Sequence, residues 1–198
     1  MKTLEFVEYI FEDTIEDYLV EETLEAVYTF KDKFPMSTHV TNIGGWQHHN
    51  LHDLDLFNPI KKKIFDCFDK SVNIIHDKYA KDMREEQSWG VSISNLFANV
   101  NGAGAYHPMH FHFGCDYTGV VYLKTPPKCG NIIMQSPFRS PWMSNFCVNT
   151  HQNYFKTYVP KAGSILIFPS YIMHHVDFNR NPDGEDRVSM SFNLKVTY

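Results

Sequence analysis

The chain has 198 residues, of which 43% are hydrophobic and 21% charged, and its formal net charge is −5. These proportions are those of globular proteins and exclude an intrinsically disordered chain or a fibrous rod. The acidic balance, without a basic stripe, argues against nucleic acid as a partner. Because the length is that of one ordinary domain, we expect a single domain over residues 1–198.

The N-terminal part of the chain shows mainly helical patterns. A short strand is expected within residues 4–15, followed by apolar residues at helical spacing over residues 21–34. A clearer helix begins at Asn58-Pro59, a helix start signal, and continues to Tyr79 with apolar residues at three- and four-residue steps. Its other face is charged, so this helix should pack on a flat surface. Residues 1–85 are therefore expected to be mainly helical support.

After Trp89 the pattern changes to short strands separated by turns rich in glycine and proline. The expected strands are residues 91–97, 109–113, 117–124, 131–135, 154–159, 164–168 and 187–196. Such a series predicts a double-sheet jelly-roll or cupin-like core over residues 86–198. With helices first and strands afterwards, the fold class is α+β, with the N-terminal helices packed on one sheet. Residues 136–153 show no periodicity and are expected to form a functional loop.

Cysteine usage and the N-terminus indicate the compartment. The four cysteines are too few and too widely spaced for a disulfide framework or a CxxC zinc site. The N-terminus lacks the apolar core of a signal peptide, and no apolar run reaches membrane-spanning length. We therefore expect a cytoplasmic protein with reduced thiols and no membrane partner.

Eleven histidines include three groups, at residues 48–52, 107–112 and 174–175. His110 and His112 are two residues apart in an expected strand, which places both side chains on one face, where they could chelate a metal. A third ligand could come from His174 or His175, which follow another expected strand. Three protein ligands with open positions are typical of a catalytic metal site. An HxH pair alone is a weak signal, since paired strand histidines are often half-exposed sheet residues, and the distal histidine and Arg187 strengthen it.

Arg187 opens the last expected strand and shares a strand face with Ser189. A buried guanidinium binds a carboxylate through two hydrogen bonds, and a serine hydroxyl can add a third. The alternative is a surface arginine paired with a nearby acid, Asp183, Glu185 or Asp186. The neighbouring metal pattern favours an internal carboxylate site.

Three stretches of the chain resemble the 2-oxoglutarate- and Fe(II)-dependent oxygenase superfamily, in a branch that has an HxH…H…RxS pattern on a prolyl-hydroxylase-like double-stranded β-helix. Residues 110–123 are similar to that branch's HxHxxxxxSG(V/T)YY core, residues 168–176 to its FPSWLxHxV motif, and residues 187–193 to its RISISFN motif. Gly45-Trp46-Gln47 and Asn99-Val100-Asn101 also fall where the branch has a WQ pair and a WANxN segment. The resemblance covers about residues 40 to 198.

The resemblance implies a double-stranded β-helix with Fe(II) bound at its open end by His110, His112 and His174. In this alignment His175 is no ligand and should lie at the strand surface. Most of the superfamily has HxD/E where this chain has HxH, so the ligand set lacks a negative charge. Asp116 is the nearest carboxylate after His112, and we do not expect it to bind the metal.

The resemblance also implies a cosubstrate site. Arg187 would pair with the C5 carboxylate of 2-oxoglutarate, assisted by Ser189 and Tyr122. With O2 as the second cosubstrate, the expected activity is that of a dioxygenase, most simply a hydroxylase, acting on an unidentified small molecule or peptide. The exposed faces of the β-helix could support a homodimer.

The remaining histidines receive other expected roles. His107 is expected to be an exposed loop residue, and His48, His49 and His52 to form a polar loop near the mouth of the site, with a second metal site as the alternative. The 136–153 loop should help to define the substrate through its larger side chains, Phe138, Arg139, Trp142, Asn145 and His151.

Two other classes of function compete with the oxygenase. A cupin-like three-histidine metalloenzyme that does not use 2-oxoglutarate would share His110, His112 and His174 but would not need Arg187. The other alternative is a non-catalytic binding or structural module that keeps the same fold.

Overall fold

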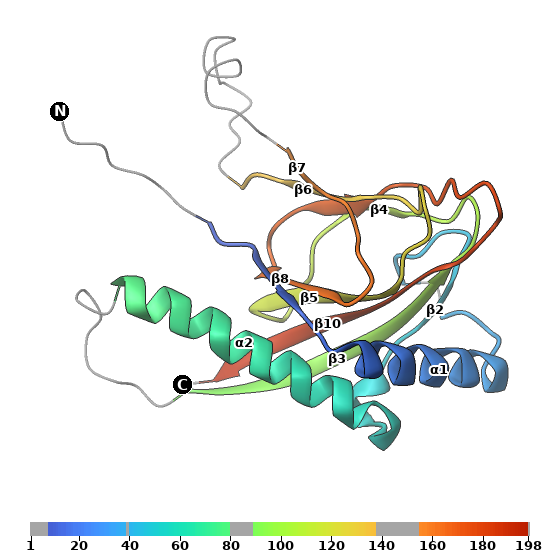
Figure 1. The fold of residues 1–198 in the computed structure, drawn as a ribbon. Coiled ribbons are helices and arrows are strands. Elements are labelled where there is room, and N and C mark those ends of the chain that lie inside the picture. The colour runs from blue at the N-terminus through green and yellow to red at the C-terminus, as the bar shows by residue number, and fades with distance from the viewer. Residues whose placement is uncertain (1–7, 39, 80–88, 138–154, 198) are drawn as a thin grey trace, which may run out of the picture.

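The structure is a computed structural model that describes residues 8–38, 40–79, 89–137 and 155–197. Two antiparallel sheets face one another, and the helices lie outside the larger sheet (Figure 1). The larger sheet has the order β1 (Phe11–Thr14), β8 (Ser164–Pro169), β5 (Tyr117–Lys124), β10 (Arg187–Thr197), β3 (Gly90–Asn101) and β2 (Trp46–His48). The smaller sheet has the order β4 (His107–His110), β9 (His174–Val176), β6 (Ile132–Gln135) and β7 (Phe155–Tyr158). This architecture confirms the expected α+β double-stranded β-helix.

Two α-helices cover the outer face of the larger sheet, α1 (Asp17–Lys33) and α2 (Asn58–Tyr79), and two 3-10 turns, η1 (Leu51–Asp53) and η2 (Asp55–Phe57), precede α2 (Figure 1). In α1 an acidic residue stands in the first turn and lysines in the last, which complements the helix dipole. Val27 of α1 and Ile64 of α2 are fully buried in the main apolar core. Helix burial of this kind holds the larger sheet in place behind the site.

Strand β10 separates the core from the interior between the sheets. Its even-numbered residues Val188, Met190, Phe192 and Leu194 are fully buried in the core that the helices cover. Its odd-numbered residues Arg187, Ser189, Ser191 and Asn193 line a cavity between the sheets. This alternation follows from the two-residue period of a strand.

The strand predictions are confirmed at most positions and corrected at three. The strand expected over residues 109–113 ends at His110, so His112 lies beyond it. β2 and β9 were not predicted, because three residues are too few to show a strand period. Residues 8–79 also supply β1 and β2 to the larger sheet, so this part is not helical support alone.

Two further expectations bear on other parts of the chain. Most of the 136–153 loop, including its five named side chains, lies outside the described residues. No helix in the described part of the chain is long and apolar enough to span a membrane.

Candidate metal centre

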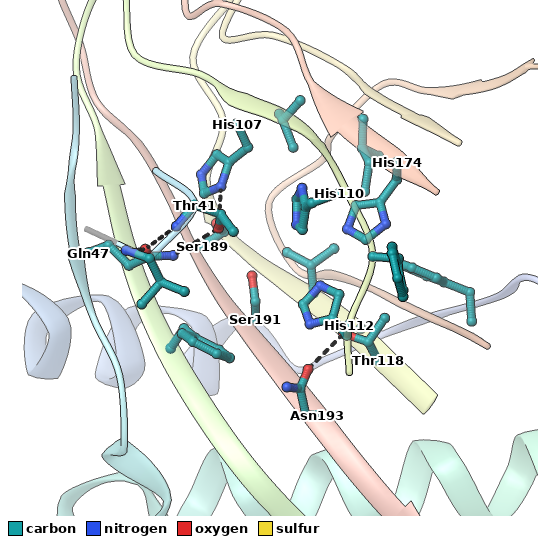
Figure 2. A pocket seen from close by; sticks show the side chains of 18 of the residues that line it. Thr41, Gln47, His107, His110, His112, Thr118, His174, Ser189, Ser191 and Asn193 are labelled. Carbon is teal, nitrogen blue, oxygen red and sulfur yellow. Dashed lines mark hydrogen bonds between the residues drawn. The ribbon is translucent and has the colours of Figure 1, made fainter. Parts of the chain in front are cut away.

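Three histidines meet at one end of the cavity. His110 ends β4 and His174 begins β9, and the antiparallel register places these two residues opposite each other. His112 joins them from the segment after β4 (Figure 2). Ligand nitrogens of His110, His112 and His174 all lie within 4.8 Å of one another. This is the set that the sequence indicated, with His174 rather than His175 as its third member.

The route by which His112 reaches the cluster differs from the sequence prediction. The HxH spacing was expected to act through the pleat of one strand, but β4 ends at His110. The backbone N–H of His112 instead donates to the carbonyl of Ser170 at 3.0 Å, which ties the segment after β4 to the segment after β8. Tertiary contacts, and not the alternation of side chains along one strand, therefore bring His112 next to His110.

Hydrogen bonds orient two of the three rings. Nδ1 of His110 lies 2.7 Å from the carbonyl oxygen of Pro108, and Nδ1 of His174 lies 2.8 Å from that of Ile172. Because a carbonyl oxygen only accepts, each Nδ1 must carry the hydrogen and donate it. Nε2 of both rings then keeps its lone pair, which is the arrangement of a histidine that binds a metal.

Burial keeps the cluster uncharged at neutral pH. It lowers the pKa of His174 to about 3 and that of His112 to about 4, and the neighbouring His110 contributes in the same direction. The pKa of His110 is also lowered by burial, against the hydrogen bond to Pro108. Three neutral imidazoles with converging nitrogens fit a divalent transition-metal ion and leave coordination positions open.

Arg187 lies in the wall of the same cavity and is only 2% exposed. Its Nη1 donates to the carbonyl oxygen of Cys129 at 2.6 Å, with longer contacts to those of Gly130 and Asp177. Among the residues that the structure describes, no carboxylate lies within ion-pair distance of Arg187. A buried cation without a paired anion, beside a cavity, is suited to an anionic ligand.

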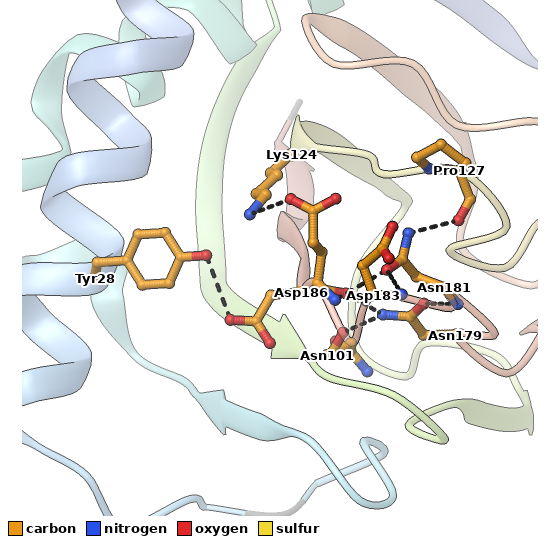
Figure 3. Close-up of polar contacts among 9 residues, drawn as sticks. Tyr28, Asn101, Lys124, Pro127, Asn179, Asn181, Asp183 and Asp186 are labelled. Atoms are coloured by element: carbon orange, nitrogen blue, oxygen red, sulfur yellow. Dashed lines mark hydrogen bonds and ion pairs between the residues drawn. The ribbon is translucent and has the colours of Figure 1, made fainter.

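The nearby acids do not pair with Arg187, so the surface-pair alternative is wrong. Glu185 pairs with Lys124 at 3.2 Å, and Asp186 accepts a hydrogen bond from the Tyr28 hydroxyl at 3.4 Å (Figure 3). Glu185 is exposed and Asp186 is half-buried against Tyr28 of α1, whereas Arg187 is buried and lines the cavity.

An asparagine network holds the loop that leads into Arg187 (Figure 3). The Asn179 amide donates to the carbonyls of Asn101 and Glu185, each at 2.8 Å. The Asn181 amide donates to the carbonyl of Pro127 at 3.0 Å, which links this loop to the turn before β6. The same turn supplies the carbonyls that contact Arg187, so the network fixes both sides of the arginine.

Gly130 allows this close approach. Its φ of +92° lies in the left-handed region, and a Cβ there would stand 2.2 Å from the carbonyl oxygen of Asp177 and 2.8 Å from Nη1 of Arg187. No side chain larger than hydrogen fits without moving the arginine or the backbone.

Ser189 and Tyr122 lie next to the arginine in the cavity wall. They pair directly across β10 and β5, and both are buried. Burial also raises the pKa of Tyr122, so its hydroxyl stays protonated and can donate. The cavity, of about 360 Å³, thus brings together all six residues that the sequence indicated, His110, His112, His174, Arg187, Ser189 and Tyr122.

The prediction for His107 is wrong. This residue begins β4, is 8% exposed and lines the cavity, where burial lowers its pKa to about 3. Its Nδ1 lies 3.4 Å from the Thr41 hydroxyl (Figure 2). The register of β4 shifts between His107 and His110, so no regular spacing connected it with the cluster.

Other cavity residues were also missed. Gln47, Ser191 and Asn193 all line the wall, and Gln47 donates through Nε2 to Asn99 at 2.9 Å. The alternation that starts at Arg187 could have indicated Ser191 and Asn193, because every second residue of a strand faces the same way.

The remaining histidine groups lie outside the cluster. His48 belongs to β2, and its ring packs edge to face against Phe30 of α1, with ring centroids 5.0 Å apart. His48 is therefore not part of a polar loop. Within the described ranges, no second group of metal-ligating residues forms at His48, His49 and His52. Asp116 accepts from the backbone of Val196 and does not belong to the cluster, as predicted.

Comparison with known proteins points to the family that the sequence motifs resemble. A family model described as "Putative 2OG-Fe(II) oxygenase" matches residues 95–193, which is 99 of the 198 residues. No curated protein matches the chain.

Solved structures share the fold at low sequence identity. A Pseudomonas putida prolyl-4-hydroxylase has a TM-score of 0.60 at 13% identity, over 95% of this chain and 92% of that one. A Trichoplax adhaerens prolyl hydroxylase, solved with a hypoxia-inducible-factor peptide, has 0.61 at 15% identity over 94% and 82%. The α-ketoglutarate-dependent epimerase SnoN of nogalamycin biosynthesis has 0.63 at 13% identity over 96% and 79%. Because hydroxylases and an epimerase share this fold, the fold alone does not select the reaction.

Proposed function

Because the chain belongs to the 2OG-Fe(II) oxygenase family, a family of oxidoreductases, we propose that it is an Fe(II)- and 2-oxoglutarate-dependent hydroxylase formed by a single domain. One observation carries the proposal. A neutral three-histidine cluster lines the same cavity as a buried arginine that has no carboxylate partner among the described residues. The first supplies metal ligands and the second an anion site, and this reaction needs both.

In this proposal His110, His112 and His174 hold Fe(II) through one nitrogen each. The carbonyls of Pro108 and Ile172 fix two of the rings with Nε2 free, so little reorganisation is needed for binding. Three protein ligands would leave coordination positions open for a chelating cosubstrate and for O2. The histidine in place of the usual carboxylate leaves the metal more positive, which strengthens its attraction for an anionic chelator.

Arg187 would bind the C5 carboxylate of 2-oxoglutarate. Only its Nη1 donates to backbone carbonyls in the described part of the chain, so further guanidinium N–H groups remain for the ligand. Ser189 and Tyr122 stand beside it and can donate one hydrogen bond each. A cupin-like enzyme that uses no oxo acid would have no need for this charged pocket.

The bound metal and cosubstrate supply the oxidising chemistry, in which 2-oxoglutarate, O2 and a substrate C–H bond become succinate, CO2 and C–OH. The protein residues orient and enclose the reactants. Arg187 would hold one end of the cosubstrate, and the three histidines would position the other end through the metal that they bind. Apolar side chains from both sheets, among them Val120, Ile132 and Phe168, form the rest of the wall and limit the entry of water.

Anaerobic addition of 2-oxoglutarate to the Fe(II)-loaded protein tests the proposal. We expect a weak visible charge-transfer band, which succinate at the same concentration should not produce because it cannot chelate through a ketone. Admission of O2 with a substrate pool should then release succinate in stoichiometry with the hydroxylated product. A protein that retains iron but gives no band would point to the metalloenzyme without 2-oxoglutarate, and one that retains no iron would point to a binding module.

A further inference from the structure

The cavity wall is nearly free of charge. Among the described residues that line it, Arg187 is the only lysine, arginine, aspartate or glutamate. The other polar groups are hydroxyls, amides and imidazoles. Under the proposed function, the two carboxylates of 2-oxoglutarate are directed to Arg187 and to the metal. No charged side chain of the described wall then remains for the substrate.

This distribution decides which groups can enter. A charged group loses its hydration on entering a cavity and needs an opposite charge or strong hydrogen bonds in return. An ammonium or guanidinium group would meet no carboxylate on the described wall. Among the described residues of the wall, a phosphate or carboxylate would meet only the arginine that the cosubstrate already occupies. An uncharged group needs no counter-charge from the wall and does not compete with the cosubstrate for Arg187.

A hydrogen-bond donor faces the substrate side of the cavity. Ser191 stands two residues beyond Ser189 on the cavity face of β10, toward the histidines (Figure 2). Its Oγ accepts from the side-chain amide of Asn99 at 3.3 Å. The hydroxyl hydrogen of Ser191 is therefore available to donate, and its natural partner is a neutral oxygen such as an amide carbonyl.

The mouth of the cavity carries two exposed phenylalanines. Phe111 and Phe113 flank His112, their ring centroids are 4.4 Å apart, and both contribute to the cavity wall. Phe113 is 79% exposed, which is unusual for a side chain of this size. An exposed aromatic pair beside a site offers a surface on which a flat apolar group can lie.

We propose that the substrate group entering this cavity is uncharged and apolar, lies on the Phe111–Phe113 pair, and carries a neutral carbonyl that accepts a hydrogen bond from Ser191. The inference rests on the proposed function, because it requires that 2-oxoglutarate occupies Arg187. It names the substrate class of the site, which neither the family nor the fold specifies.

Three probes that share a benzyl group and differ in charge test this inference. They are phenylacetamide, phenylacetate and phenylethylammonium, added to the Zn(II)-loaded protein with 2-oxoglutarate bound, so that no turnover occurs. Binding is followed by protein NMR titration. We expect phenylacetamide to bind about tenfold or more tightly than either ion, since only the ions lose hydration without a counter-charge. Equal or tighter binding of either ion would overturn the inference.

A matched pair of variants locates the binding site. Phe113→Ala should weaken the binding of phenylacetamide about threefold or more, because half of the aromatic pair is lost. Phe178→Ala is the control, since Phe178 is 44% exposed, packs on Tyr106 and does not belong to the cavity wall. Equal effects of the two variants would place the probe elsewhere and contradict the proposal.

The same samples separate this inference from the proposed function. The binding of 2-oxoglutarate is measured before any probe is added. If it fails to bind, the proposed function is wrong, Arg187 stays free, and phenylacetate should become the best probe, which overturns the inference as well. If 2-oxoglutarate binds and a charged probe still binds as tightly as phenylacetamide or more tightly, only the inference fails.

Discussion

The two ends of the cavity are built from different kinds of strand. The histidine end comes from β4 and β9, which have four and three residues, and from the irregular segment that carries His112. The arginine end comes from β10, an eleven-residue strand buried behind two helices, and from a turn tied down by asparagines. The metal end therefore depends on a few ligands, whereas the arginine end depends on dense packing. Mutations should separate these two kinds of dependence.

The largest effect is expected at the histidine end. His174→Ala removes a buried ligand from the three-histidine cluster and should lower metal affinity about 1000-fold or more, because loss of even a supporting hydrogen bond costs about 10- to 100-fold. Competition with a metal-sensitive dye measures this. His175→Ala is the matched control, as His175 is adjacent but outside the cluster. Loss of metal in the control instead would reassign the ligand.

At the arginine end, Gly130→Ala should act on folding. The added Cβ meets the Asp177 carbonyl and Arg187, so we expect a loss of about 3 kcal/mol in the free energy of unfolding. Gly184→Ala is the control, because Gly184 also has a positive φ, +73°, but no atom within 4 Å of an added Cβ. Gly184→Ala should lower the free energy of unfolding by only about 1 kcal/mol, because an alanine is strained in the left-handed backbone conformation. Urea unfolding of both variants gives the difference, and equal losses would remove the role assigned to the close contact.

Arg187→Gln should weaken cosubstrate binding at the arginine end of the cavity and leave metal binding at the histidine end unchanged. We expect the affinity for 2-oxoglutarate to fall about 30-fold or more, since truncating one member of a buried charged pair costs about 2 kcal/mol or more. Metal affinity without the cosubstrate should stay within about twofold, because Arg187 is no ligand. Arg180→Gln is the control, a cation that lies over the ring of Phe178 outside the cavity. Parallel losses of metal and cosubstrate would show that the two ends are not independent.

The smallest effect is a pH dependence that should appear only at the histidine end. Burial lowers the pKa of His112 to about 4, so below pH 6.5 the unfolded chain takes up a proton that the folded chain does not. The stability of the metal-free protein should therefore fall with falling pH between 6.5 and 5, by about 1.4 kcal/mol per pH unit for each such histidine. His112→Asn should reduce this slope by one histidine's share, as read from urea unfolding at several pH values. An unchanged slope would contradict the assignment. Arginine stays charged throughout this range.

Much of the fold could be predicted from the sequence, because long elements repeat their pattern many times. The α2 helix and the strand over residues 117–124 were located at their observed bounds. Strands of three residues, such as β2 and β9, carry too few positions to show a period. They form here because neighbouring strands provide the hydrogen-bonding partners, which is information that no local window contains.

The candidate site was predicted in its residues and only partly in its geometry. The motifs indicated His110, His112, His174 and Arg187, and all four line one cavity. The sequence did not indicate that His112 arrives from outside the strand, nor that His107 is buried beside it. The end of β4 at His110 and the register shift between His107 and His110 are features of its pairing with β9, which the sequence of β4 alone does not show.

The sequence alone determined which side chains are present, their order, and the alternation that directs Arg187 and Ser189 to one face of β10. Only the tertiary structure decided which of them meet. Strands far apart in the chain become neighbours in a double-sheet fold, so β9 lies between β4 and β6. The placing of His110 opposite His174 is a consequence of that pairing. The local pattern supplies the ligands, and the long-range register brings them to one point.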